Sequence, residues 1–464
     1  MTFWDSFIVD EPGPKYLAIC DAIAAAIGRG DLRPGKRLPS HRMMASKLGV
    51  SVGTITRAYQ EALDRGLIAG EIGRGTYVRE HPPMPLKVVD HSRISPGALD
   101  LYQNFPVRIP DLENKIWADT LAALGRRNDL GEAVRASWSE LVERYQRAGA
   151  TWIRRTGLDA PPKNIVECPG FPSALCAIVG AATDPGDLVL APLFSHPSIK
   201  LLAKQYHLRI LGLPMDRYGI ELDAFEGACR ESSPKLLYCA PTIHSPTTKT
   251  MPEERRRAVA EIAEKYDVLI VEDESAAFLL PEPPLPVSAF APQQSFFLGN
   301  VWLALSLGLV TTYMVVPDAW KEPMSTAVAA TSGITPALVS EIAAMWVESD
   351  EIDHLIERRR TELIARNALA LEILGDRPLF CHPCGHHIWL ELPAPWTSEL
   401  FVVRAEQAGV AINNGEWFLV DHGPAPESVR VCIGNAPGRD ELRWALQTLD
   451  RLIDVPRSST QPDV

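Results

Sequence analysis

Short apolar runs that alternate with helical stretches are the feature that most limits the fold of this chain. The runs have the length of β-strands, and residues typical of turns and helices separate them. Strands covered by helices on both faces are apolar throughout, as these runs are. The pattern predicts an α/β fold with a mostly parallel, doubly covered sheet. The predicted strands are residues 164–168, 187–191, 208–213, 235–240, 268–271, 296–298 and 309–316.

After these runs the pattern becomes mainly helical. A long helical region, residues 335–374, leads to an apolar run at 388–392, a helix from Ser398 and another apolar run at 429–433. Helices followed by few strands predict a smaller α+β subdomain. The tail, residues 454–464, is predicted to be disordered because it is polar and terminal.

A proline cluster, His81-Pro82-Pro83-Met84-Pro85, divides the chain. Clustered prolines prefer extended backbone and cannot continue a helix, so they indicate a semi-rigid linker. We expect a first domain at residues 12–80, a linker at 81–97 and a second domain at 98–453. The charges differ as well: residues 1–80 carry 11 basic and 9 acidic side chains, and the remainder carries 35 and 49.

The first domain has the pattern of three helices and a β-wing. Residues 29–79 hold 10 basic and 4 acidic side chains, which suits either a nucleic-acid surface or a solvated helical face. Caps and glycines bound each element. The predicted helices are residues 16–27, 41–48 and 52–63, and the predicted wing strands are 67–69 and 76–78.

Several polar side chains of this domain suit DNA contact. A recognition helix presents its first turns to base edges, while the preceding helix and the wing bind phosphates. Short hydroxyls and bidentate guanidinium groups serve these purposes. The three helices alone would also fit a small helical cap. The candidate DNA-binding residues are Arg42, Ser51, Thr54, Thr56, Arg57 and Arg74.

The density of motifs favours DNA binding over a helical cap. The first domain resembles the GntR-type winged helix-turn-helix over about residues 14–79. The resemblance implies that Arg42, Ser51, Thr54 and Arg74 contact operator DNA. At Thr56 some members of the group have another arginine, so this sequence departs from them there. The matching segments are Leu32 to Arg42, Leu48-Gly49-Val50-Ser51, Gly66-Leu67-Ile68 and Gly73 to Val78.

The second domain resembles a fold-type I aminotransferase. Its position behind a GntR winged helix is that of MocR-type transcriptional regulators, so the resemblance implies a cytoplasmic, DNA-binding homodimer. The matching segments are Leu99-Asp100-Leu101, Asp184-Pro185-Gly186-Asp187, Leu237 to Thr242, Val271-Glu272-Asp273 and Val429-Arg430-Val431.

The chemistry of that family needs a lysine, and this sequence lacks it at the matching position. Pyridoxal phosphate forms a Schiff base with a lysine and needs cationic or N–H donors for its phosphate. Gly308-Leu309 and Tyr313 set the register, which puts Leu303 at the lysine and Val310 at the phosphate-binding arginine. Neither side chain has the required nitrogen. Because this sequence departs from the family at these two positions, we expect no catalytic residue and no covalently bound cofactor.

Other cofactor contacts are lost as well. Ser245 replaces the asparagine that bonds the ring oxygen, Ala276 replaces a tyrosine, and Pro172 removes a backbone donor from the phosphate cradle. Lys249 is the nearby lysine that would have to form the Schiff base instead. In that alternative the chain is a working aminotransferase, or a sensor that depends on pyridoxal phosphate.

Three polar positions of the pocket remain. His196 can still stack on a ring, Asp273 matches the residue that holds the cofactor's pyridine nitrogen, and Arg430 matches the residue that binds a substrate carboxylate. Structural roles are equally open, since a strand-end aspartate can cap a helix and an arginine can pair with a carboxylate. With Arg430 in its ligand-binding role, the domain would sense a small carboxylate or amino-acid effector.

Metal and membrane binding are not expected. Residues 381–387, with two cysteines and three histidines, have possible zinc ligands, but extended backbone sends adjacent side chains to opposite faces. No run approaches the ~18 apolar residues of a membrane span, and the start lacks a basic region followed by an apolar core. Eight cysteines in 464 residues fit reduced thiols.

Overall fold

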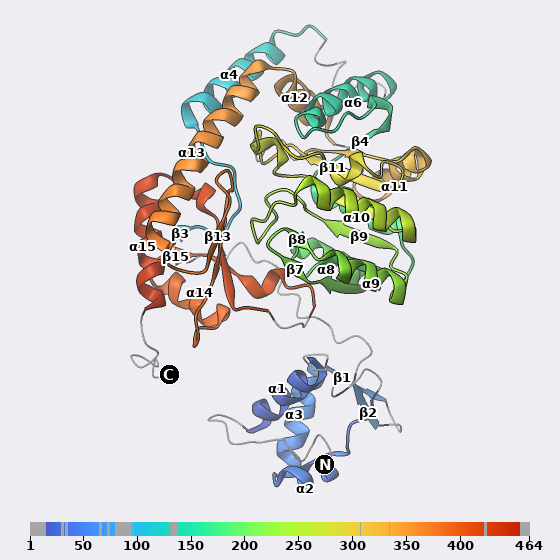
Figure 1. Cartoon of the computed structure of the whole chain (residues 1–464), viewed down its shortest axis with the longest axis vertical. Coiled ribbons are helices and arrows are strands. Elements are labelled where there is room, and N and C mark those ends of the chain that lie inside the picture. The colour runs from blue at the N-terminus through green and yellow to red at the C-terminus, as the bar shows by residue number, and fades with distance from the viewer. Residues whose placement is uncertain are drawn as a thin grey trace. The chain divides into compact units, whose positions relative to one another are not determined.

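The structure is a computed structural model (Figure 1). The chain divides into two compact units, residues 1–91 and 92–464, and each is described by itself. No helix in the described part is long and apolar enough to cross a membrane. The described residues are 15–28, 32, 36–64, 67–71, 75–78, 95, 97–129, 131, 138–306, 308–333, 335–421 and 425–454.

The N-terminal unit has three helices and a two-stranded antiparallel sheet. Apolar residues at helical spacing, such as Ile19, Ile23 and Ile55, are fully buried with Ile68 and Val78 from the sheet in one small core. These helices and strands agree with the expected winged helix to within two residues. They are α1 (Lys15–Gly28), α2 (His41–Leu48), α3 (Val52–Asp64), β1 (Ile68–Glu71) and β2 (Gly75–Val78).

The larger unit is built on a seven-stranded sheet of order β4-β12-β11-β10-β9-β5-β6. Six strands are parallel to one another, and β12 runs antiparallel to both of its neighbours. Parallel neighbours need a crossover, whereas antiparallel neighbours can be joined directly, as β11 and β12 are. The strands are β4 (Ile165–Cys168), β5 (Leu188–Pro192), β6 (Arg209–Leu213), β9 (Leu236–Cys239), β10 (Leu269–Asp273), β11 (Ser295–Asn300) and β12 (Thr312–Val315).

Helices cover both faces of this sheet, which explains why its strands are apolar throughout. In β10, Val271 packs toward one face with α7 and α11, and Ile270 packs toward the other with α9 and α10. All seven predicted runs contain a strand, but the run at 309–316 was predicted too long. Leu309 belongs to the connection before β12 and packs in the core there. Its apolar side chain therefore extended the predicted strand beyond the observed one.

The large-unit helices are α4 (Pro110–Gly125), α6 (Trp138–Arg154), α7 (Phe171–Ala182), α8 (Pro197–Gln205), α9 (Leu222–Ser232), α10 (Glu253–Tyr266), α11 (Lys321–Thr331), α12 (Ala337–Val347), α13 (Asp350–Leu374), α14 (Ser398–Gln407) and α15 (Arg439–Ile453). Short 3-10 helices are Pro162–Asn164, Ala277–Leu279, Val287–Ala289, Asp318–Trp320, Gly415–Phe418 and Ile433–Asn435. Two short pairs add β3 (Leu99–Asp100) with β15 (Val410–Ala411) and β7 (Met215–Asp216) with β8 (Gly219–Ile220).

The long helix α13 leads from the seven-stranded sheet to a smaller α+β part, as Figure 1 shows in orange and red. There α13, α14 and α15 pack on a four-stranded sheet of order β13-β14-β17-β16 around a separate apolar core. The predicted smaller subdomain is therefore present. Its strands are β13 (Leu379–Cys381), β14 (Ile388–Glu391), β16 (Asn413–Asn414) and β17 (Ser428–Val431).

Candidate functional site

In the N-terminal unit, two serines fix the starts of α2 and α3. The Ser40 hydroxyl accepts a hydrogen bond from the Met43 N–H at 3.4 Å, and the Ser51 hydroxyl accepts one from the Thr54 N–H at 3.1 Å. The hydroxyls of Ser51 and Thr54 lie 2.9 Å apart. Both predicted base-reading hydroxyls thus lie together at the start of the expected recognition helix, where they also cap it.

Polar contacts hold α2 and α3 at a fixed angle. The Thr56 hydroxyl donates to the Val52 carbonyl at 2.9 Å and lies 3.3 Å from Nδ1 of His41. The Tyr59 hydroxyl donates to the Pro39 carbonyl at 2.9 Å. Thr56, a predicted DNA-binding residue, therefore also joins the two helices.

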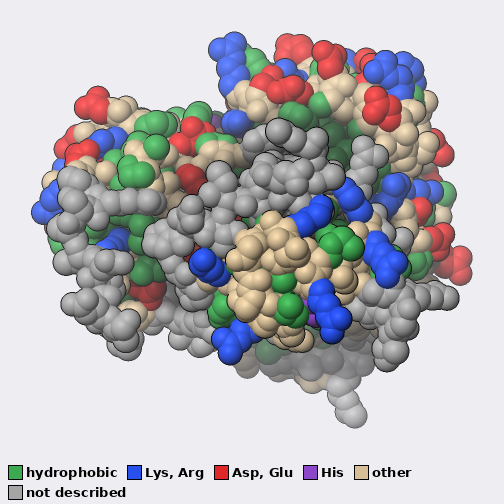
Figure 2. Space-filling view, turned by 90° about the horizontal axis from the view of Figure 1, so that it is seen from below, with side chains coloured by type: hydrophobic (Ala, Val, Ile, Leu, Met, Phe, Trp, Pro, Cys, Tyr) green, Lys and Arg blue, Asp and Glu red, His purple; other side chains and the backbone are tan. Residues whose placement is uncertain are grey.

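Two of the three arginines that were predicted to contact DNA lie within the described residues. Arg42 on α2 and Arg57 on α3 are exposed, and neither forms an ion pair with a residue that the structure describes. Figure 2 shows Lys and Arg side chains bordering a largely uncharged surface over the N-terminal helices, at its lower centre. Arg74, the predicted wing contact, lies outside the described residues.

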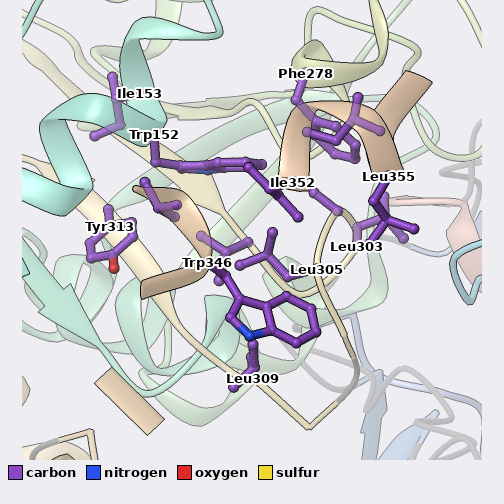
Figure 3. Packing of buried hydrophobic residues seen from close by; sticks show 14 of the residues in the cluster. Trp152, Ile153, Phe278, Leu303, Leu305, Leu309, Tyr313, Trp346, Ile352 and Leu355 are labelled. Atoms are coloured by element: carbon purple, nitrogen blue, oxygen red, sulfur yellow. The ribbon is translucent and has the colours of Figure 1, made fainter. Parts of the chain in front are cut away.

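In the large unit, Leu303 lies in the apolar core. It is 4% exposed and belongs to the cluster that includes Phe278 and Leu355 (Figure 3). The neighbouring carbonyl of Ala304 accepts a hydrogen bond from the buried Arg359 of α13. Apolar packing and the Arg359 guanidinium thus fix the connection from β11 to β12. Leu303 in this connection has no amine that could form a Schiff base.

Val310 lies at the start of α7, where the resemblance places the phosphate. Gly170 precedes α7 with a φ of +89°, and a Cβ at this glycine would meet Cγ1 of Val310 at 2.7 Å. Pro172 in the first turn has no N–H to offer. The predicted phosphate site is therefore lined by a hydrocarbon side chain. We call Ala276, Leu303 and Val310 the apolar side of the pocket that the resemblance implies, since Ala276 also packs against the core cluster of Leu303.

Asp273, at the end of β10, is bonded within the protein. Its carboxylate accepts hydrogen bonds from the Tyr238 hydroxyl at 2.9 Å, the Ser275 N–H at 3.1 Å and the Ser275 hydroxyl. Burial raises the pKa of Asp273, and these hydrogen bonds oppose the rise. Asp273 does not cap the 3-10 helix that follows, whose N-cap is Ala276, so the predicted capping role is not observed.

Arg430, on β17, is 8% exposed and lacks a carboxylate partner among the described residues. Nη1 donates to the Ser245 hydroxyl at 3.1 Å, and Nη2 donates to the Tyr102 carbonyl at 3.4 Å. The guanidinium lies 4.6 Å from the ring centroid of Phe418, and its Nε has no hydrogen-bond partner. A buried cation held by neutral groups leaves its charge uncompensated.

His196 lies at the start of α8, where it is the N-cap residue. Its ring packs edge-on against Phe171 with 5.4 Å between ring centroids, and Nδ1 accepts a hydrogen bond from the Ser198 N–H at 3.3 Å. Burial, assisted by the charge of Arg430, lowers the pKa of His196 to about 4. His196 is therefore neutral at pH 7. We call His196, Ser245 and Arg430 the polar side of the pocket.

The sequence reasoning did not recognise the positions of two buried polar residues. His387 was considered only as a zinc ligand, yet it is buried with both ring nitrogens unpartnered, and burial and Arg430 lower its pKa. Arg359 was not singled out, because an arginine in a long helix usually faces solvent. It is 2% exposed and donates to the Val107 carbonyl at 2.9 Å and to Glu113 at 2.8 Å.

The cysteine and histidine segment is folded into the protein. Nδ1 of His382 accepts a hydrogen bond from the Cys384 N–H at 3.1 Å, and Cys384 packs in an apolar core. Within the part of the chain that the structure describes, no group of three His, Cys, Asp or Glu residues has an arrangement suited to a metal ion.

The comparisons with known proteins agree with this architecture. Residues 15–78 match the model of bacterial regulatory proteins of the gntR family, and residues 138–449 match that of aminotransferase class I and II. A multiple substrate aminotransferase from Thermococcus profundus has a TM-score of 0.71 at 21% identity, covering 80% of this chain and 96% of that one. This likeness shows the fold.

The relatives of this chain include transcriptional regulators. The chain is 28% identical over 457 residues to the uncharacterized HTH-type transcriptional regulator YdeF of Bacillus subtilis, covering 97% of both. It is 24% identical to the HTH-type pyridoxine biosynthesis transcriptional regulator PdxR of Corynebacterium glutamicum, covering 79% of this chain and 80% of that protein.

A winged helix-turn-helix followed by a fold-type I aminotransferase domain defines a class of transcriptional regulators. The chain belongs to this class as a MocR-type regulator of the GntR family. A probable rhizopine catabolism regulatory protein, MocR of Rhizobium meliloti, is 24% identical over 72% of this chain and 71% of its own length.

Proposed function

We propose that this regulator binds operator DNA as a homodimer, and that its aminotransferase-like domain senses a small carboxylate without a Schiff base. The observation that carries the proposal is the contrast between Leu303, packed in the core, and Arg430, buried without a carboxylate partner among the described residues. The first leaves no amine for an imine, and the second offers a cation to an anionic ligand.

The pocket does not fit pyridoxal phosphate. The phosphate position meets Val310 instead of a cation, and Asp273 is bonded to Tyr238 and Ser275. A phosphate dianion at this position would lose its hydration without gaining a cationic partner, so its binding would be unfavourable. We therefore assign no catalytic step and no covalently bound cofactor to this domain.

An absorbance spectrum tests this assignment. We expect protein incubated with excess pyridoxal phosphate and then dialysed to be colourless, with no band that borohydride fixes. A retained, reducible aldimine would overturn the proposal in favour of an enzyme or sensor with a displaced lysine. Lys249 is the candidate for that role, but the carboxylates that raise its pKa are Asp216 and Glu391.

DNA binding is proposed for Arg42, Ser51, Thr54, Thr56, Arg57 and Arg74. Each arginine adds a phosphate or groove contact, so Arg42→Ala should weaken operator binding about tenfold and reduce the salt slope by about one. Fluorescence anisotropy at several salt concentrations measures both quantities. Arg154→Ala, at an exposed arginine of the large unit, is the matched control. Unchanged affinity in Arg42→Ala would contradict the proposed surface.

The homodimer follows from the symmetry of operators. Two winged helices related by a two-fold axis read two half-sites, and fold-type I domains form their pockets between subunits. Gel filtration with light scattering at micromolar protein should give the mass of two chains. A monomer would remove this part of the proposal and leave the other parts standing.

A further inference from the structure

A cavity of about 610 Å³ lies between the loop that contains Lys249 and helix α13. It is bordered by Arg217 in the β7–β8 turn, by the loop that contains Lys249, and by α13 and β13. Neither Arg430 nor Ser245 borders it. Its volume is in the range of small-molecule sites, which is roughly 300–1,000 Å³.

One wall of this cavity is made of large apolar side chains that are unusually exposed. Ile364 is 46% exposed, Leu371 is 51% exposed and Phe380 is 39% exposed. Ile364 and Leu371 are seven residues apart on α13, so they lie on the same face of the helix. Covering such a contiguous apolar surface is favourable by about 25 cal/mol per Å².

The other border carries two cations. The Lys249 ammonium makes no hydrogen bond and no ion pair with any described residue, and burial lowers its pKa while Asp216 and Glu391 oppose this at longer range. Asp216 itself is paired with Arg255 at 2.7 Å. Arg217 stacks on Tyr218, with 4.5 Å between the guanidinium carbon and the ring centroid.

The loop keeps Lys249 in place at this border. The His244 N–H donates to the Lys249 carbonyl at 2.8 Å, and the Thr248 N–H donates to the His244 carbonyl at 2.6 Å. The backbone of Lys249 is therefore fixed, and only its side chain has to order when an anion binds. An ordered backbone reduces the entropic cost of binding.

We propose that this cavity is a second small-molecule site, which binds an apolar monocarboxylic acid. The carboxylate lies at Lys249 and Arg217, and the hydrocarbon chain covers Ile364, Leu371 and Phe380. A carboxylate matches the two cations, and a neutral or cationic head group would leave them unpaired. The proposal does not require a ligand at Arg430.

The test uses the full chain and octanoate, below its micelle-forming concentration, in isothermal titration calorimetry. We expect saturable binding, at least tenfold weaker binding of 1-octanol, and a tenfold loss of octanoate affinity in Lys249→Met. Lys249→Arg should bind within threefold of the natural protein, because it restores the charge. Lys204→Met is the matched control, since Lys204 is an exposed lysine elsewhere on the large unit.

The apolar wall has its own variant. Leu371→Asp should weaken octanoate binding at least tenfold, whereas Val403→Asp, at a position 46% exposed on α14, should have no effect. Thermal unfolding of each variant confirms that it folds. Arg430→Ala should bind octanoate normally, which separates this site from the effector pocket. Equal binding of octanoate and octanol, or full affinity in Lys249→Met, would overturn the proposal.

Discussion

The apolar and polar sides of the pocket differ in what their residues gain by burial. Val310 is 48% exposed, whereas Leu303 packs among hydrocarbon neighbours, so the protein itself satisfies Leu303. Arg430 is nearly as inaccessible, but it is held by Ser245, a backbone carbonyl and an aromatic ring, with Nε unpartnered. A buried side chain that packing satisfies and a buried side chain that keeps an unpaired donor can thus be told apart by their partners.

The largest expected effect is on the apolar side. Leu303→Ala should lower the free energy of unfolding by about 2–5 kcal/mol, because it leaves a cavity beside Phe278 and Leu355. Urea unfolding followed by tryptophan fluorescence measures this. Leu303→Met keeps the volume and should cost less than about 1.5 kcal/mol. Equal, small losses in both variants would mean that Leu303 is not a core residue.

A titratable group behind this core gives a pH-dependent test. Glu167, on β4, is paired in the sheet with Tyr313 of β12, and burial raises the pKa of its carboxyl to about 7. The folded state then binds the proton more tightly than the unfolded state. The stabilisation by protonated Glu167 is therefore fully present below about pH 4.5. Stability should decrease between about pH 4.5 and 7, by roughly 3 kcal/mol.

Comparison with Glu167→Gln isolates this effect. Buried histidines act in the opposite direction, since the lowered pKa of His196 makes stability decrease as the pH falls toward about 4. The difference in unfolding free energy between the natural protein and Glu167→Gln removes their contribution. A difference that does not vary from pH 4.5 to 7 would show that Glu167 is ionised in the fold.

The smallest expected effect on stability is on the polar side. Arg430→Met should change the unfolding free energy by less than about 1 kcal/mol, because an apolar side chain removes an uncompensated buried charge. The same change should abolish thermal stabilisation by amino acids or keto acids while operator affinity stays normal. Arg439→Met, at an arginine paired with Glu362, is the control that keeps the ligand response. A ligand response retained in Arg430→Met would exclude Arg430 as the effector site.

Some features could be predicted from the sequence because they depend on local patterns. The seven strands follow from apolar runs, and α2 follows from Ser40 and Gly49 at its ends. The absence of an amine at Leu303 is a property of the residue itself. Arg430 was recognised as a candidate, but the sequence left open whether a carboxylate compensates it.

Other features depend on residues far apart in the chain. Arg359 reaches the Ala304 carbonyl across 55 positions, and Arg430 reaches Ser245 across 185. The cavity of Lys249 combines a loop, a turn, a helix and a strand, none of which signals a cavity alone.

The sequence by itself determined the two-part architecture and placed a leucine, which has no amine, at position 303, because hydrophobic periodicity and side-chain chemistry are local. Only the tertiary structure decided which buried polar groups are satisfied. Whether a charge finds a partner depends on which distant segments fold against it, as the pairing of Asp273 with Tyr238 and the unpartnered Nε of Arg430 illustrate.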